Sequence, residues 1–346
     1  MTDALPPGIG LPVIQAPMAG VQEAELAIAV AEAGGLGSLP CAMLSPAQLA
    51  DALQRVAART TRPVNLNFFC HAMPTPDAAR EQRWRDALAP YYREAGLAPD
   101  AGAPQATRRP IDAEIVSLLE PFRPQVLSFH FGLPPPGLLQ RIKSWGARVL
   151  ASATTVEEGR WLAAHGADVV IAQGIEAGGH RGHFLSADLS LQPTTRELVV
   201  ALHKAIDLPI VAAGGIGSHA DVRMLLDAGA SAVQAGTAYL LCPEATTTAV
   251  HRSALRDAGR AGETALTNLF SGRPARGLVN RLMRELGPMS DLPPAFPLAA
   301  NALAPLRAHA ESHGRGDFSP LWAGTSTDAC RAVPAAEMTR MLAGMD

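Results

Sequence analysis

Short apolar runs alternate along the chain with longer segments in which apolar residues recur every three or four positions. The short runs are rich in β-branched residues and predict eight strands, at 13–16, 36–39, 64–68, 126–129, 148–152, 169–172, 210–213 and 232–235. Amphipathic helices are predicted between them, for example at 23–33, 46–59, 156–165, 194–205 and 219–228. Eight strands alternating with helices match a closed, parallel α/β structure, the (β/α)8 TIM barrel, better than an open sheet.

Two stretches exceed the minimal repeat of this barrel. Residues 70–110 follow the third strand, are rich in Pro, Arg and Tyr, and predict an insertion. Residues 246–346 predict a C-terminal helical extension that packs on the barrel and covers its active-site end. We therefore expect a barrel core at 1–245, with the excursion at 70–110, followed by the extension. Because barrel active sites lie at the C-terminal ends of the strands, both additions are placed to wall a pocket.

Composition and charge exclude several classes of partner. The chain has 346 residues, 48% of them hydrophobic, and a net charge of −3 without a basic run, which argues against nucleic acid. No uninterrupted apolar stretch approaches the roughly 20 residues that cross a bilayer, and residues 1–10 lack the order of a secretory signal. The four cysteines are far apart, without metal-ligand spacing. We expect a reduced, cytoplasmic protein with no metal site and no membrane contact.

Glycine-rich loops follow the seventh and eighth predicted strands. The strand at 210–213 runs into GGIG at 214–217 before a helix, and the strand at 232–235 ends in QAGT at 234–237. Such loops either make tight turns only, or bring backbone amides and a helix N-terminus to a phosphate. The loops after the seventh and eighth strands are the usual phosphate site of a barrel. The phosphate belongs to a substrate or a cofactor. Since neither a dinucleotide fingerprint nor a P-loop is present, FMN is the candidate left by elimination.

The segment after the sixth strand, QGIEAGGHRGH at 173–183, carries the candidate acid–base chemistry. Gln173 ends the strand and can point an amide donor and acceptor at a planar heterocycle. His180 lies among glycines, and the ordinary pKa of a histidine is near neutral pH, so it either transfers protons or braces the loop, and we favour the first. His183 is a second candidate for this role. Glu176 is a further candidate base or a partner of Arg181.

Two asparagines alternate along the third strand. We expect Asn65 and Asn67 to point to opposite faces, with one of them at the barrel interior or its rim. An amide inside an apolar strand needs a hydrogen-bond partner, which is either a flavin edge or neighbouring backbone.

Taken together, these motifs resemble the nitronate monooxygenases, formerly called 2-nitropropane dioxygenases, over nearly the whole chain. The matching stretches are QAPMAG at 15–20, GGLGSL at 34–39, NLNFF at 65–69, the segment 173–182, AAGGI at 212–216, QAGT at 234–237 and SGRPARG at 271–277. The last of these is of the class I type.

The resemblance implies an FMN-dependent oxidoreductase that converts alkyl nitronates and O2 to carbonyl compounds and nitrite. It implies that Met18 lines the flavin ring, that Asn67 and Gln173 bond its polar edge, and that Gly178 lies alongside. His180 matches the family's catalytic histidine. The residues implied to hold the phosphate are Gly215, Gln234, Ala235, Gly236 and Thr237. The partners would be a small nitronate and O2, and the protein would be a monomer or a homodimer.

One segment departs from the family pattern. Many class I members carry tyrosines and a lysine in the C-terminal segment that closes the substrate pocket, whereas residues 294–301 here read PAFPLAAN. We therefore expect a more apolar pocket that favours longer alkyl nitronates over propionate 3-nitronate, with Tyr91 and Tyr92 of the insertion within reach. Two other functions suit a barrel of this kind: an NAD(P)H-dependent FMN reductase of quinones or enoyl thioesters, and a flavin-free phosphate-ligand-binding or isomerase barrel.

Overall fold

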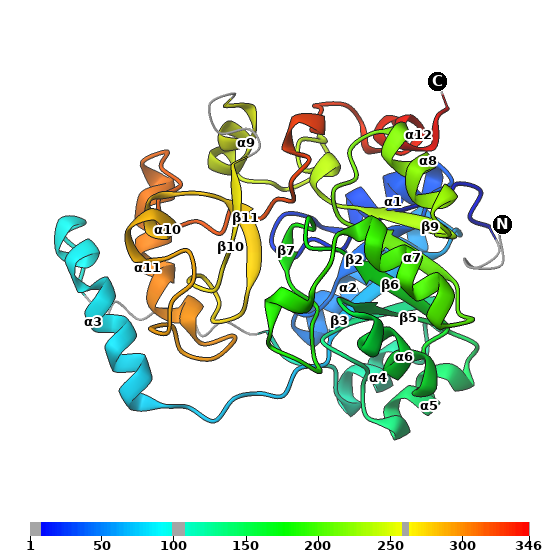
Figure 1. The fold of residues 1–346 in the computed structure, drawn as a ribbon, viewed down its shortest axis with the longest axis horizontal. Coiled ribbons are helices and arrows are strands. Elements are labelled where there is room, and N and C mark those ends of the chain that lie inside the picture. Colours follow the sequence, from blue (N-terminus) through cyan, green and yellow to red (C-terminus); the bar gives the residue numbers. More distant parts are fainter. Residues whose placement is uncertain (1–7, 99–107, 258–262, 346) are drawn as a thin grey trace.

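Eight parallel strands form the centre of the computed structural model, which describes residues 8–98, 108–257 and 263–345 (Figure 1). They are β1 (Val13–Gln15), β2 (Gly37–Pro40), β3 (Val64–Phe69), β4 (Val126–His130), β5 (Arg148–Ala153), β6 (Val169–Gln173), β8 (Ile210–Ala213) and β9 (Ala232–Ala235). They pair in the order β1-β9-β8-β6-β5-β4-β3-β2. A parallel bridge between Ile14 and Leu36 joins the two edges, so the sheet closes and the predicted barrel is confirmed.

Each predicted strand agrees with the observed one to within one residue at either end. The reason is burial on both faces, which makes barrel strands nearly continuous apolar runs. One set of strand side chains fills the barrel interior, among them Ile14, Val126, Leu150, Ile171 and Val211. The alternate side chains pack outward against the helices. Polar side chains enter these strands towards their C-terminal ends, where the candidate site lies.

A ring of helices surrounds the sheet. It comprises α1 (Ala24–Glu32), α2 (Pro46–Arg59), α4 (Ala113–Leu119), α5 (Pro136–Ser144), α6 (Val156–Ala164), α7 (Thr195–Ala205), α8 (His219–Asp227) and α12 (Ala335–Ala343). The last of these returns from the C-terminal segment to pack against α1 and α8. Within the described ranges, no helix is both long enough and apolar enough to cross a membrane. Residues 1–7, on which part of the secretory-signal argument rests, lie outside the described residues.

A second, smaller layer stands beside the barrel. In it α3 (Ala78–Glu94) of the insertion packs on α11 (Ala299–Ser312), and in Figure 1 the cyan and orange helices lie together on the side away from the barrel helices. The layer also holds α10 (Arg281–Leu286), whereas α9 (Ala249–Arg256) packs in a separate apolar cluster with Leu240 and Leu321. Apolar side chains of both helices, including Trp84, Leu88, Leu303 and Leu306, form its core. Part of the predicted excursion, 99–107, lies outside the described residues.

A three-stranded antiparallel sheet joins this layer to the barrel. It consists of β10 (Thr264–Thr267), β11 (Ala275–Leu278) and β7 (Gly179–His180), in which Ala275 pairs with His180 and Arg276 with Gly179. The sequence pattern predicted none of these strands: β10 and β11 lie in the extension that was expected to be helical, and β7 lies in the loop after the sixth strand. Short 3-10 turns at Leu189–Leu191, Thr237–Tyr239 and Thr327–Ala329 complete the described elements.

Candidate active site

A cavity of about 230 Å³ opens at the C-terminal ends of the barrel strands. The structure brings all the residues proposed for cofactor binding and proton transfer to its wall: Met18, Asn67, Gln173, Gly178, His180, Gly215, Gln234, Ala235, Gly236 and Thr237. These residues come from the C-terminal ends of five strands, from the loops that follow them, and from the segment that contains β7. Neither Glu176 nor His183 lines this cavity.

The loop after β1 is held by a network of glutamines. The Gln22 side chain accepts a hydrogen bond from the Met18 amide at 2.7 Å and donates one to the Ser38 carbonyl at 2.6 Å. Gln15 accepts from the Ser38 amide at 3.0 Å and donates to Gln22 at 2.8 Å. Because these groups are buried and mutually satisfied, they fix the position of Met18 at the cavity wall. Sequence reasoning did not single out Gln22.

The expectation that the two asparagines of β3 point to opposite faces is wrong, because side chains two positions apart share a face and the alternate residues Leu66 and Phe68 pack outward against the helices. On this shared face the two asparagines have different partners. Asn67 lines the cavity and donates to the Ser128 hydroxyl at 2.9 Å. Asn65 is fully buried and donates to the Ser38 hydroxyl at 2.9 Å, away from the cavity. Asn67 is therefore the one that faces the site.

Gln173 fixes the loop that carries His180. Its amide nitrogen donates to the His180 carbonyl at 2.9 Å, and its amide oxygen accepts from the Gly182 backbone at 2.7 Å. His130 holds the same carbonyl through Nε2 at 3.1 Å, and its Nδ1 lies 3.0 Å from the Ser152 hydroxyl. Burial lowers the pKa of His130 to about 3, so this histidine is neutral at physiological pH. An amide has a second N–H and a second lone pair, so Gln173 keeps one of each for a ligand.

The imidazole of His180 is oriented from the opposite side by Ser271. His180 Nε2 lies 2.8 Å from the Ser271 hydroxyl, which in turn donates to the Arg273 carbonyl at 3.3 Å. The hydroxyl proton is therefore used, Nε2 carries the hydrogen, and the lone pair on Nδ1 is left for the cavity. Burial, followed by the positive charge of Arg108, lowers the pKa of His180 well below its ordinary value. At neutral pH the ring is an unprotonated base, as its proposed role requires.

Free backbone amides gather where the sequence predicts a phosphate. Across the described residues, the amides of Gly215, Ile216, Gly236 and Thr237 donate no hydrogen bond, although these residues line the cavity. Gly215 has a φ of +67°, a backbone conformation that other residues rarely adopt. The Thr237 hydroxyl is already used, since it accepts from the Gly324 amide at 2.9 Å.

The N-terminus of α8 does not contribute to this amide cluster. The carboxylate of Asp221 accepts from the amides of Gly217 at 3.0 Å and Ser218 at 2.9 Å. This capping interaction places a negative charge where sequence reasoning expected a helix end open to phosphate. The donors are the loop amides alone.

Two further predicted residues have structural roles. A Cβ on Gly178 would lie 2.5 Å from the Gly324 nitrogen, so this glycine permits close packing of the C-terminal segment. Glu176 accepts from the amide of Thr195 at 2.9 Å and from its hydroxyl at 3.0 Å. Arg181 is fully buried and donates to the carbonyls of Gly174 and Gln173 rather than to Glu176.

The cavity is more cationic than the sequence suggested. Arg108 and Arg307 line it, and Nη1 of Arg108 is buried without a hydrogen bond. Burial, together with Arg307, lowers the pKa of Arg108 to about 10, so the guanidinium is still charged at neutral pH. Residues 294–301, from which an apolar pocket was expected, do not line this cavity, whose charge comes from Arg108 and Arg307.

The tyrosines of the insertion do not reach the cavity. Tyr91 packs against Phe318 with ring centroids 5.3 Å apart, and the Tyr92 hydroxyl donates to the Ala302 carbonyl at 2.7 Å. Both side chains are buried between α3 and α11. The insertion contributes Arg108 to the cavity instead.

Comparison with known proteins agrees with the resemblance seen in the motifs. A family model described as nitronate monooxygenase matches residues 6–343. The chain belongs to this family. It is 42% identical over 337 residues to a nitronate monooxygenase of Pseudomonas aeruginosa, covering 97% of this chain and 96% of that protein. It is 39% identical to one from Paraburkholderia phytofirmans, with 97% and 92% covered.

Among solved structures, a nitroalkane oxidase from Streptomyces ansochromogenes is similar throughout. Its TM-score is 0.87 at 37% sequence identity, with 97% of this chain and 96% of that chain covered. The predicted membership of the nitronate monooxygenase family is thus confirmed.

Proposed function

We propose that this protein is an FMN-dependent enzyme that oxidises alkyl nitronates with O2 to carbonyl compounds and nitrite. The observation that carries the proposal is one cavity in which a neutral His180 faces a cluster of free loop amides. Membership of the nitronate monooxygenase family and the similarity to a nitroalkane oxidase support it.

The residues present fit FMN. The amides of Gly215, Ile216, Gly236 and Thr237 would bind its phosphate, since free N–H donors are what a phosphate requires. Met18, Asn67 and Gln173 would face the ring. Gln234 offers a buried amide oxygen without a hydrogen bond, which suits an N–H of a heterocycle. When bound, FMN supplies the electron acceptor for the nitronate and, once reduced, the donor for O2.

The role of His180 follows from its protonation state. A neutral nitroalkane must lose its α-proton before it can be oxidised as a nitronate, and the lone pair on Nδ1 can accept that proton. Ser271 keeps the ring in the required orientation from Nε2. A positioned base contributes about 10²–10⁴-fold to a rate. For a nitronate, which arrives without the proton, the same ring orients the substrate.

Arg108 points to the substrate class. An unpaired, buried guanidinium is costly unless an anion joins it, and a carboxylate can form a bidentate pair with it. We therefore propose that nitronates bearing a carboxylate, such as propionate 3-nitronate, are preferred to alkyl nitronates of equal length. This replaces the apolar-pocket expectation.

The test begins with the visible spectrum of the purified protein, which must show oxidised flavin. Anaerobic titration with an alkyl nitronate should then bleach this absorption. Bleaching by NADH but not by the nitronate would instead support a reductase on the same barrel. A colourless protein that gains no flavin on incubation with FMN would leave the phosphate-ligand-binding or isomerase alternative.

A further inference from the structure

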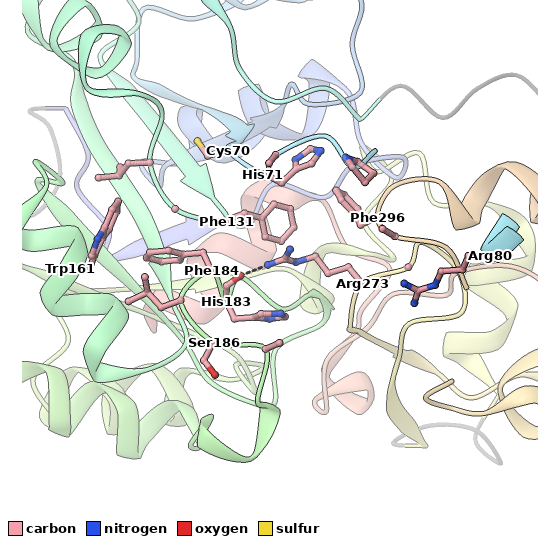
Figure 2. A pocket seen from close by; sticks show the side chains of 18 residues that line it. Cys70, His71, Arg80, Phe131, Trp161, His183, Phe184, Ser186, Arg273 and Phe296 are labelled. Atoms are coloured by element: carbon pink, nitrogen blue, oxygen red, sulfur yellow. Dashed lines mark hydrogen bonds between the residues drawn. The ribbon is translucent and has the colours of Figure 1, made fainter. Parts of the chain in front are cut away.

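A second cavity, of about 660 Å³, lies outside the one that holds His180. We call it the outer cavity, and its wall includes His71, Arg80, Phe131, His183, Arg273 and Phe296. In Figure 2, Arg273 extends across it towards the loop at His183, with Trp161 and Phe184 on the opposite side. The two cavities have no lining residue in common.

The outer cavity is lined by arginines that each keep an unused donor, and by histidine ring nitrogens without a partner. No Asp or Glu is among the described residues that line it, whereas Arg80 and Arg273 both are. The Nε atoms of both arginines, and Nδ1 of His183, are buried without a hydrogen bond. The His183 side chain is only 7% exposed. Buried polar atoms in native proteins are normally satisfied, so this set indicates a ligand that accepts hydrogen bonds.

The nearby carboxylate that could neutralise these arginines, Glu158, already accepts hydrogen bonds from other groups. Glu158, whose charge raises the pKa of Arg273 against the effect of burial, is itself 1% exposed and lies outside the lining. Its oxygens accept from the amides of Phe184 at 2.6 Å and Leu185 at 3.2 Å, and from Thr154. Glu158 therefore fixes the wall at 184–185, and Nη2 of Arg273 donates to the His183 carbonyl instead of to an acid (Figure 2).

A single layer of aromatic rings separates the outer cavity from His180. Phe131 and Phe296 have centroids 5.5 Å apart, and each lies close to the His180 ring, at 6.3 and 5.3 Å. The Arg273 guanidinium stacks 4.1 Å above Phe131. Phe131 has a φ of +70°, which is rare for a bulky residue and is typical of strained functional positions. The partition between the two cavities is thus a single layer of rings, and it contacts His180 on one side and Arg273 on the other.

We infer that the outer cavity is an anion-binding site, which captures the negatively charged group of the substrate before it passes Phe131 and Phe296 to reach His180. Its ligand is a small organic anion with a planar oxyanion group, either nitronate or carboxylate. Guanidinium groups bind such oxygens through charge-assisted hydrogen bonds, and the surrounding rings accommodate the carbon chain. A site lined by one sign of charge also raises the local concentration of oppositely charged ligands. The inference rests on the proposed function for the identity of the substrate, but not for the site itself.

The test uses benzoate, a planar carboxylate that is ionised at neutral pH, has no nitro group and cannot be turned over. Its binding to the purified protein is measured by calorimetry for the wild type, Arg80→Gln and Arg83→Gln. Arg83 is the matched control, because it lies three positions along α3, is exposed and does not line the cavity. We expect Arg80→Gln to weaken binding about three- to fivefold, as for loss of one partly exposed charge. Arg83→Gln should leave binding unchanged.

A second measurement follows nitronate turnover by the same variants. Arg80→Gln should lower kcat/KM by a similar factor with kcat unchanged, and this loss should shrink at high salt because the charge is then screened. Equal probe binding in the wild type and Arg80→Gln, or equal weakening in Arg83→Gln, overturns the outer site. Arg80-dependent probe binding without any nitronate oxidation retains the site and refutes the proposed function. Nitronate oxidation without Arg80-dependent probe binding retains the proposed function and refutes the outer site.

Discussion

Replacing Arg108 by glutamine tests the substrate class most directly. The side chain lines the cavity of His180, its Nη1 has no hydrogen bond, and its Cζ lies 5.8 Å from the centroid of Phe296. No ion pair of Arg108 occurs among the described residues, so the variant breaks no existing salt bridge. Glutamine retains a donor and much of the length while removing the charge.

The expected magnitude follows from the energy of a charged hydrogen bond. Such bonds contribute about 1.5–3 kcal/mol, which corresponds to roughly 10- to 150-fold in kcat/KM at 25 °C. Propionate 3-nitronate, whose carboxylate would pair with Arg108, should lose this factor. The nitronate of 1-nitropropane has the same chain without the carboxylate and should change by less than about threefold, within the range of weak surface charge effects.

The assay compares steady-state kcat/KM for both nitronates in the wild type, Arg108→Gln and Arg109→Gln. Arg109 is the neighbouring control, which pairs with Asp112 at 3.0 Å and does not line the cavity. Equal losses for both nitronates would refute the carboxylate argument and leave Arg108 as a general electrostatic group. A wild-type preference for the uncharged chain would restore the apolar-pocket expectation.

Three further predictions concern the base, the phosphate site and acid stability. His180→Asn should abolish turnover of any neutral nitroalkane that the wild type accepts, and should reduce nitronate oxidation less, while flavin content stays unchanged. Anaerobic stopped-flow reduction measures both substrate forms, and equal losses of rate for the two forms would exclude His180 as the base. Gly215→Leu, at φ +67°, should lower flavin occupancy measured by absorbance, and a folded variant with full occupancy would contradict the phosphate assignment. Because burial lowers the pKa of His130 from 6.5 to about 3, its unfolded form binds the proton first. The free energy of unfolding should therefore fall as pH drops below 6.5, by up to about 1.4 kcal/mol per pH unit for each such histidine. Denaturant midpoints measured from pH 6.5 to 4 test this, and midpoints that do not change with pH would disprove it.

The barrel was predictable because its signals are local. Each strand is a short apolar run buried on both faces, and each loop glycine occurs directly after a strand end. The position of His180 followed from the same rule, since the segment after β6 must lie at the catalytic end of the barrel. Local patterns indicated His180, Gln173 and the loops after β8 and β9, while Met18 and Gly178 came from the family resemblance, and all of these residues line one cavity.

The position of Arg108 was not predictable in this way. The insertion shows a helical signal, with Trp84, Leu88 and Tyr92 on one face, but its partner is α11, more than two hundred positions later. Only that packing returns the chain to the cavity at residue 108. The pairing of β7 with β11 is equally distant, and β7 has two residues, too few for any alternation to be seen.

These distant contacts also explain why the acid–base group cannot be considered part of the barrel alone. The backbone of His180 is held by Gln173 and His130 from the barrel, while its ring is oriented by Ser271 and its strand pairs with Ala275. Ser271 and Ala275 belong to the C-terminal segment. A barrel lacking that segment would keep the free amides after β8 and β9 but lose the contacts that direct Nδ1 into the cavity. Cofactor binding and proton transfer thus depend on different parts of the chain, and variants at Ser271 should impair the second while leaving the first intact.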